Sequence, residues 1–288
     1  KLSHNLDILE DGQGGLLEIL YHNEIIFVSY SENRGNGKSS TSVASANFDH
    51  ENLNFKNIFR AEPPINSGYH FGSRLVIKDD FLFITAGERG QGMIAQDPAK
   101  HPGSIIRIHL DGKIPKDNPK FKGKNNWLPE IYQIGVRNPQ GMDVSPYNNK
   151  IYLTNHGAKG GDWFGEVKKG ENYGWPRVTF GKNYNGTTIT NDTTLPGLIN
   201  PLFYWVPSIA PSGMTFVTSK IYPDWKGNLL VGSLSFQYLE RVVLKNEKVI
   251  KREKLLEDIG RVRNVKQGPD GYVYVAIDGK GIIKLIPK

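Results

Sequence analysis

The sequence predicts an all-β fold, and three observations lead to this prediction. The chain of 288 residues contains 32 glycines and 17 prolines scattered along its length, which is typical of many short strands joined by turns. A turn-forming pair followed by a short apolar run recurs in five segments. Helical periodicity is almost absent, and only short pieces such as DPAKHP and YPDWKG are expected to form single helical turns.

Each recurring segment predicts a reverse turn that leads into a buried strand, because Asp, Asn or Gly precedes β-branched and aromatic residues. In chain order the segments are HNEIIFVSY from His22, KDDFLFITAG from Lys78, NNKIYLTNHG from Asn148, KGNLLVGSL from Lys226 and PDGYVYVAIDG from Pro269. The second, fourth and fifth are followed by another strand, at GSIIRIHLDG, SFQYLERVVLKNEKV and GKGIIKLIPK. These three pairs are predicted to be hairpins.

The spacing of the segments is close to the length of a four-stranded propeller blade with variable loops, so we predict one β-propeller domain over residues 1–288. A β-sandwich is the alternative, but sandwiches of this length do not usually repeat one signature so often. We expect six blades with part of the N-terminal blade lacking, because the opening residues, KLSHNLDILEDG, are interpreted as the inside of a blade.

Composition argues against several classes of function. The formal net charge is +7. The lysines that contribute to this charge lack the interleaved aromatic residues of a nucleic-acid-binding groove, so they predict a solvated basic face. The lysines typical of this basic face are Lys113, Lys116, Lys120, Lys122 and Lys124. The chain has no cysteine, which excludes a disulfide framework and a thiol nucleophile. No stretch approaches the roughly 20 apolar residues of a membrane span, and the first residues lack the apolar core of a signal peptide.

Two loops carry polar groups that suit catalysis or ligand binding. In GYHFGSRL, residues 68–75, His70 lies between glycines just before a strand, and histidine can take a proton near neutral pH. A structural role is the alternative for a single histidine. In IGVRNPQGMD, residues 134–143, Arg137 and Asn138 precede a proline turn and could present fixed donors to an anionic or carbonyl ligand.

A glycine-rich loop suits a hard cation. Residues 154–176, TNHGAKGGDWFGEVKKGENYGWP, combine glycines with Asp162, Glu166 and Glu171. Backbone carbonyls and carboxylates are the oxygen donors that calcium takes. The loop lacks the alternating aspartates of an EF-hand, so an ordered loop without an ion is the alternative.

A pair of arginines suits an anionic ligand. Arg261 and Arg263 in RVRNVKQGPDG, residues 261–271, face the same side of a strand. Two like charges on one face repel unless an anionic group lies between them. The pair therefore favours a multi-carboxylate ligand over simple surface charge.

Nine motifs follow one another from residue 11 to the C-terminus. They are DGQGGLLEI, SYSE, HFGSRL, GERGQ with AQD, PEIYQIGVRNPQGM, NHGAKGGD, KKGENYGWP, FYWVPSIAPSGMTF and RVRNVKQGPDGYVYV. In the identity and order of these motifs, the chain resembles the quinoprotein glucose and sorbosone dehydrogenase family, specifically its soluble aldose sugar dehydrogenase branch. The resemblance implies an oxidoreductase that oxidises aldoses at the anomeric carbon to lactones. It also implies hydride transfer to pyrroloquinoline quinone (PQQ), calcium (Ca²⁺) as a Lewis acid and an electron acceptor of unknown identity.

The resemblance also assigns roles to residues. His70 resembles the general base, and Arg137 resembles the residue that stabilises the developing oxyanion. The positions that match contacts to the cofactor are Gln13, Arg137, Asn138, His156, Ser208, Arg261 and Arg263. The backbone carbonyls of Gly157 and Ala158 match the donors to the catalytic calcium. Asp162 and Tyr173 match the surroundings of a second, structural calcium.

Three positions depart from the family pattern. Ala158 stands where a proline is usual, Trp163 where an acidic residue is frequent, and Ser235 where several members have a lysine. Because Ala158 lacks the fixed φ of a proline, calcium is expected to bind less rigidly. These departures keep open a propeller without cofactor that serves as a sugar-binding or interaction module. A calcium-dependent lactonase is a further alternative, because the same fold hosts such hydrolases. The resemblance implies a periplasmic or secreted protein, and the oligomeric state is left open.

Overall fold

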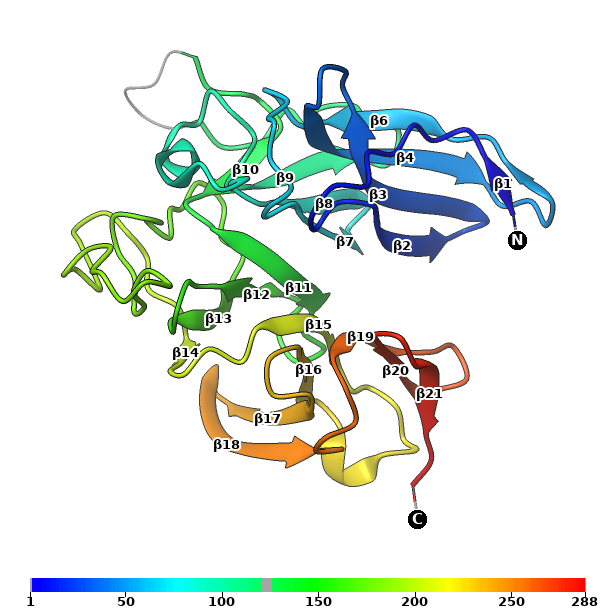
Figure 1. Cartoon of the computed structure of the whole chain (residues 1–288). Coiled ribbons are helices and arrows are strands. Elements are labelled where there is room, and N and C mark those ends of the chain that lie inside the picture. Colours follow the sequence, from blue (N-terminus) through cyan, green and yellow to red (C-terminus); the bar gives the residue numbers. More distant parts are fainter. Residues whose placement is uncertain (1, 121–125, 288) are drawn as a thin grey trace. The chain divides into compact units, whose positions relative to one another are not determined.

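The computed structural model describes residues 2–120 and 126–287, and within them nearly all regular structure is β-strand (Figure 1). In these residues the helical elements are two short 3₁₀ turns, η1 (Gly92–Gln96) and η2 (Pro223–Trp225). The all-β prediction is confirmed, and YPDWKG contains η2, whereas DPAKHP forms turns without a helix. Lys122 and Lys124 of the predicted basic face lie outside the described residues. No described helix is long and apolar enough to cross a membrane.

The chain divides into two compact units. The first comprises Lys1–Pro139, Lys168–Arg177 and Pro196–Ile199, and the second comprises Gln140–Val167, Val178–Leu195 and Asn200–Lys288. The prediction of a single domain over residues 1–288 stays a prediction.

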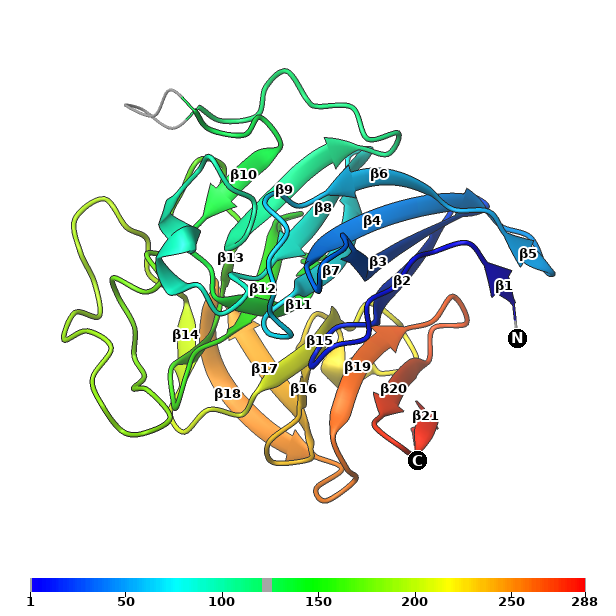
Figure 2. The ribbon, with the colours of Figure 1, turned by 45° about the horizontal axis from the view of Figure 1, so that its top comes forward.

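The first unit holds two four-stranded antiparallel sheets, called blades 1 and 2 (Figures 1 and 2). Blade 1 has the order β2-β3-β4-β6, with strands β2 (Leu16–His22), β3 (Ile25–Asn33), β4 (Ser39–Asn47) and β6 (Lys56–Arg60). Blade 2 has the order β10-β9-β8-β7, with strands β7 (Gly72–Lys78), β8 (Phe81–Ala86), β9 (Ser104–His109) and β10 (Ile131–Ile134). Their shared core includes Phe27, Val43, Leu75, Ile84 and Ile106. A short parallel pair, β1 (Ser3–His4) with β5 (Asn52–Leu53), forms a separate two-stranded sheet.

The second unit contains most of blade 3 and all of blades 4 and 5. Blade 3 consists of β11 (Asn138–Val144), β12 (Ile151–His156), β13 (Asp162–Glu166) and β14 (Phe203–Trp205). Blade 4 consists of β15 (Pro211–Phe216), β16 (Leu229–Ser233), β17 (Leu239–Lys245) and β18 (Lys248–Leu255). Blade 5 consists of β19 (Val262–Gln267), β20 (Val273–Ile277) and β21 (Gly281–Leu285). One core cluster packs blade 3 against blade 4 and a second packs blade 4 against blade 5.

The repeated segments of the sequence correspond to one position in the fold. Each forms the second strand of its sheet, and these strands are β3, β8, β12, β16 and β20. Asn23 and Glu24 before β3 both have positive φ, as do Asp79 and Asp80 before β8, which is the backbone of a tight hairpin turn. The three predicted hairpins, β8–β9, β16–β17 and β20–β21, are confirmed. The repetition of antiparallel sheets is that of the β-propeller class, as the sequence predicts.

The prediction of six blades needs correction. In residues 2–120 and 126–287 there are five such sheets, one for each repeated segment, and none of these residues forms a sixth. The opening residues do not form the inside of an incomplete blade, because β2 is the first strand of a four-stranded sheet. The sheet with three strands is blade 5, the last along the chain.

Candidate functional site

His70 is held by a carboxylate in the first unit. It lies in the loop before β7, with a left-handed backbone at φ 51°, and its Nδ1 is 2.5 Å from Oε1 of Glu88. Glu88 is 2% exposed, and its Oε2 accepts the backbone N–H of Gly92 at 2.7 Å. A carboxylate oxygen accepts hydrogen bonds, so in a neutral imidazole paired with it Nδ1 is the nitrogen that donates. Nε2 is left with its lone pair, which is the arrangement of a general base oriented by a carboxylate.

Three other predicted residues lie around the His70 loop. The side-chain oxygen of Gln13 accepts the backbone N–H of His70 at 3.0 Å. The side-chain oxygen of Asn138 accepts the N–H of Gly72 at 3.1 Å, and Asn138 is buried at the start of β11. The carbonyl of Arg137 accepts the N–H of Glu88 at 2.8 Å. The structure therefore brings together Gln13, His70, Arg137 and Asn138, which lie far apart in the sequence.

The guanidinium of Arg137 faces an aromatic ring. Arg137 is buried, and its Cζ is 5.3 Å from the centroid of the Trp175 ring. The backbone of Trp175 is fixed on both sides, since its N–H donates to the carbonyl of Gly135 at 3.0 Å and its carbonyl accepts from Gln96 at 2.8 Å. A cation over an aromatic face is attracted by the ring, so Trp175 restricts where the Arg137 charge can point. Tyr173 is buried nearby in sequence and donates its N–H to Ile134 at 3.2 Å.

In the second unit, Asp162 shapes the predicted cation loop. Asp162 is 1% exposed; its Oδ1 accepts the N–H of Gly157 at 2.8 Å, and its Oδ2 accepts the N–H of Ala210 at 2.7 Å. The hydroxyl of Ser208 donates to the carbonyl of Ala158 at 3.3 Å. Nε2 of His156 lies 2.7 Å from the carbonyl oxygen of Pro211. His156, Gly157, Ala158, Asp162 and Ser208 thus belong to one polar cluster.

The Gly157 region is rich in backbone oxygen. A Cβ atom on Gly157 would lie 2.4 Å from the carbonyl oxygen of Gly161 and 2.6 Å from that of Gly160. The described part of the chain contains no cluster of three or more His, Cys, Asp or Glu side chains that could hold a metal ion. Carbonyl oxygens are suitable donors for calcium, so the loop fits a hard cation held by backbone atoms. The pairing of Asp162 with Tyr173, a residue of the first unit, around a second ion stays a prediction.

Arg261 and Arg263 share a carboxylate that the sequence analysis missed. Nη2 of Arg263 is 2.8 Å from Oδ2 of Asp278, and Nε of Arg261 is 3.4 Å from the same oxygen. The hydrogen bond and charge of Arg263, followed by those of Arg261, hold the pKa of Asp278 below its usual value. An anionic group therefore lies between the two arginines, as their shared face requires, but it belongs to the chain itself. One carboxylate against two guanidinium groups leaves an excess positive charge.

Glu88 was also missed as a functional residue. In the sequence Glu88 lies in the motif GERGQ, which by itself indicates no role for it. The available signal was an acidic residue two positions after the end of the buried strand β8, in the loop at the end of the sheet. Its pairing with His70, 18 residues earlier, follows from the β7–β8 hairpin, which brings the two loops together.

Comparison with known proteins gives consistent matches. The family model described as Glucose / Sorbosone dehydrogenase matches residues 1–285. Aldose sugar dehydrogenase YliI of Escherichia coli strain K12 is 38% identical over 296 residues, covering 98% of this chain and 80% of that protein. The structure of the soluble aldose sugar dehydrogenase of Escherichia coli in the apo-form has a TM-score of 0.93 and 37% identity, covering 98% of this chain and 85% of that one. The PQQ-bound form of aldose sugar dehydrogenase from Streptomyces coelicolor, at 23% identity, has a TM-score of 0.76, covers 96% of this chain and 81% of that one, and shares the fold.

Proposed function

Because the chain belongs to the glucose/sorbosone dehydrogenase family, we propose that it oxidises aldose sugars at the anomeric carbon to lactones, using pyrroloquinoline quinone and calcium. The observation that carries the proposal is the pair of His70 and Glu88, a base whose protonated nitrogen is fixed by a buried carboxylate. The proposal includes a periplasmic or secreted location, because the resemblance implies one, and an electron acceptor that is not identified.

The first unit would carry the proton chemistry. Oxidation of the sugar removes a hydride from the anomeric carbon and a proton from the anomeric hydroxyl. Nε2 of His70 would take the proton, and the hydrogen bond from Nδ1 to Glu88 would stabilise the imidazolium that forms. Arg137, whose position is restricted by Trp175, would stabilise the negative charge that develops on an oxygen of the quinone. Asn138 would be a further contact to the cofactor.

The second unit would hold the ion and would supply further contacts to the cofactor, beside those of Gln13, Arg137 and Asn138. When bound, pyrroloquinoline quinone accepts the hydride, and calcium makes it a better acceptor. Arg261 and Arg263 fit an anionic cofactor because they exceed the charge of Asp278 by one. The carbonyls of Gly157 and Ala158 would bind calcium, with His156 and Ser208 as further contacts to the cofactor. The PQQ-bound relative from Streptomyces coelicolor supports the choice of quinone.

Two of the departures have a physical reason in the structure. Trp163 is buried in β13, where it is paired with Asn155 and Tyr204, so this position serves packing. Ala158 keeps a carbonyl that accepts the Ser208 hydroxyl, so a donor is present without the proline ring. The retained carbonyl of Ala158 supports a cation at Gly157 and Ala158.

The direct test adds pyrroloquinoline quinone and calcium to the purified protein and follows reduction of an artificial dye with glucose, galactose and xylose. We expect reduction that requires both additions and that stops when a chelator removes calcium. Quinone binding is measured separately, by quenching of tryptophan fluorescence. If the quinone does not bind in the presence of calcium, the dehydrogenase proposal is wrong, and a propeller without cofactor is favoured.

Replacing Asp278 with asparagine should strengthen binding of an anionic cofactor. The change removes the negative charge that Arg261 and Arg263 share, so their attraction for carboxylates increases. Because these groups are half-exposed, we expect the affinity for pyrroloquinoline quinone to rise by only about two- to fivefold, and the gain to shrink in high salt. The fluorescence titration measures it. Asp270→Asn is the control, since Asp270 pairs with Lys284 on the same blade. Equal or weaker binding by Asp278→Asn would contradict the assignment of the arginines.

A further inference from the structure

Arg89 follows Glu88 and is one of the most deeply buried side chains, at 2% exposure. Its Nε donates to the carbonyl of Tyr69 at 2.9 Å, and its Nη2 donates to the carbonyl of Ser67. Its Nη1 donates to the carbonyl of Ser39 at 2.9 Å, and Nη2 also reaches the Ser39 hydroxyl at 3.0 Å. The guanidinium therefore joins the segment just before His70 to the first residue of β4.

Burial of the Arg89 charge is costly. The guanidinium donates these hydrogen bonds to uncharged oxygens of Ser39, Ser67 and Tyr69, and its Cζ lies 3.8 Å from the centroid of the Phe71 ring. Burial lowers the pKa of Arg89 to about 10, although the charges of Asp11 and Glu88 act in the opposite direction. Removing a cation from water costs several kcal/mol, which good geometry and several hydrogen bonds must offset. Only arginine offers a planar fork that can meet carbonyl oxygens from three residues at once.

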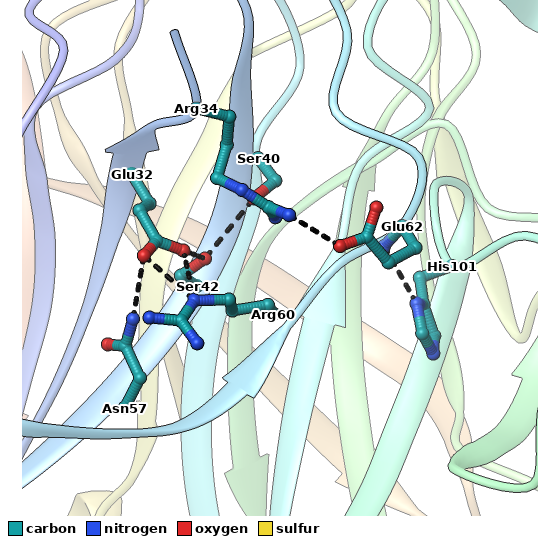
Figure 3. A network of polar contacts seen from close by, with 8 residues as sticks. All are labelled: Glu32, Arg34, Ser40, Ser42, Asn57, Arg60, Glu62 and His101. Carbon is teal, nitrogen blue, oxygen red and sulfur yellow. Dashed lines mark hydrogen bonds and ion pairs between the residues drawn. The ribbon is translucent and has the colours of Figure 1, made fainter.

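The anchor at Ser39 is itself held firmly. The N–H of Ser39 donates to the carbonyl of Ile65 at 3.0 Å. The next residue, Ser40, accepts a hydrogen bond from Arg34 at 3.0 Å, and Arg34 pairs with Glu62 at 2.6 Å (Figure 3). The backbone N–H of Glu62 donates to Nδ1 of His101 at 2.9 Å. Glu32 on β3 contacts Ser42 on β4 and both Asn57 and Arg60 on β6, as Figure 3 also shows.

We propose that Arg89 is a positioning residue for His70: Glu88 fixes the imidazole ring, and Arg89 fixes the backbone from which the ring projects. His70 has positive φ, a conformation that a non-glycine residue keeps only when its surroundings impose it. The N–H of Arg89 also donates to the carbonyl of His70 at 3.3 Å. Two successive residues after β8 therefore hold the base at its side chain and at its backbone. The inference rests on the proposed role of His70 as general base.

The test compares Arg89→Met with Arg107→Met. Arg107 is a matched control because it is also buried, its Cζ lies 3.8 Å from the centroid of Phe81, and its partners are Asp117 and Asn118, away from the His70 loop. Hydrogen exchange is measured at the amides of His70 and Gly72, which donate to Gln13 and Asn138. Arg89→Met should accelerate exchange there by about tenfold or more, because the loop loses its anchor, whereas Arg107→Met should not.

Activity supplies the second readout. A displaced base should lower kcat by about 10- to 100-fold while KM changes little, since a shift of about 1 Å can cost that much. Arg107→Met should lose stability but keep kcat. Arg89→Lys, which keeps the charge but not the fork, enters both measurements if Arg89→Met does not fold, and it should show the same accelerated exchange.

The two readouts separate the inference from the function on which it rests. The exchange measurement needs neither sugar nor quinone, so it remains informative if the wild-type protein reduces no dye. Unchanged exchange at His70 and Gly72 in a folded Arg89 variant would overturn the inference even if the dehydrogenase activity is found. Accelerated exchange with unchanged kcat would overturn it as well, because the loop would then be anchored without consequence for the base.

Discussion

Replacing His70 with asparagine is expected to lower kcat by about 10²- to 10⁴-fold, the usual contribution of a general base. Asparagine is the most informative replacement because it tolerates positive φ, and the φ of His70 is 51°. Its side-chain amide can also still donate to Glu88, so the buried carboxylate keeps a partner. The variant therefore removes the basic nitrogen while disturbing the loop as little as possible. The measurement is dye reduction at saturating sugar, with quinone and calcium present.

The control for this variant is His109→Asn, because His109 lies at the end of β9 and contacts Phe81 rather than the His70 loop. It should keep wild-type kcat. Quinone binding by His70→Asn should also be unchanged, which separates loss of chemistry from loss of cofactor. If His70→Asn retains more than about a tenth of wild-type kcat, another group takes the proton and the proposed mechanism fails.

The strands were predictable because their signal is local. A hairpin turn with two residues of positive φ needs Asn, Asp or Gly, and the buried strand that follows needs β-branched or aromatic residues. Both requirements are visible in a window of ten residues, as at Asp79 and Asp80 before β8. The number of blades was overestimated where this local signal was absent and an incomplete blade was inferred from the opening residues instead.

The candidate site was predictable in part, for a different reason. His70, Arg137 and Asn138 lie in loops whose polar character shows in the sequence, and the structure groups them with Gln13. Glu88, Arg89 and Asp278 were missed because their roles are defined by their partners. A buried carboxylate beside an imidazole and a surface carboxylate look the same in a sequence. The distinction arises only when the β7–β8 hairpin brings residues 70 and 88 together.

Replacing Gly87 with alanine is expected to damage the same base without touching its side chain. A Cβ on Gly87 would lie 2.0 Å from the carbonyl oxygen of His70 and 2.5 Å from its carbonyl carbon. Both are backbone atoms, so no change of rotamer can relieve the clash, and the His70 loop must move. We expect kcat to fall about 100-fold and the free energy of unfolding to fall by about 1–3 kcal/mol. Dye reduction and urea unfolding measure the two effects.

Gly186→Ala provides the contrast, because Gly186 has positive φ but no atom lies within 4 Å of its Cβ position. It should lose about 1–2 kcal/mol of stability from backbone strain alone and keep its kcat. Equal kcat for Gly87→Ala and the wild type would mean that the position of His70 is not critical. The expected contrast follows from three successive residues: Gly87 permits the close approach of the His70 backbone, Glu88 holds the ring, and Arg89 holds the preceding turn. Because each of these residues acts on a different part of the His70 loop, a substitution at any of the three should reduce kcat, and only Gly87→Ala should do so by steric displacement.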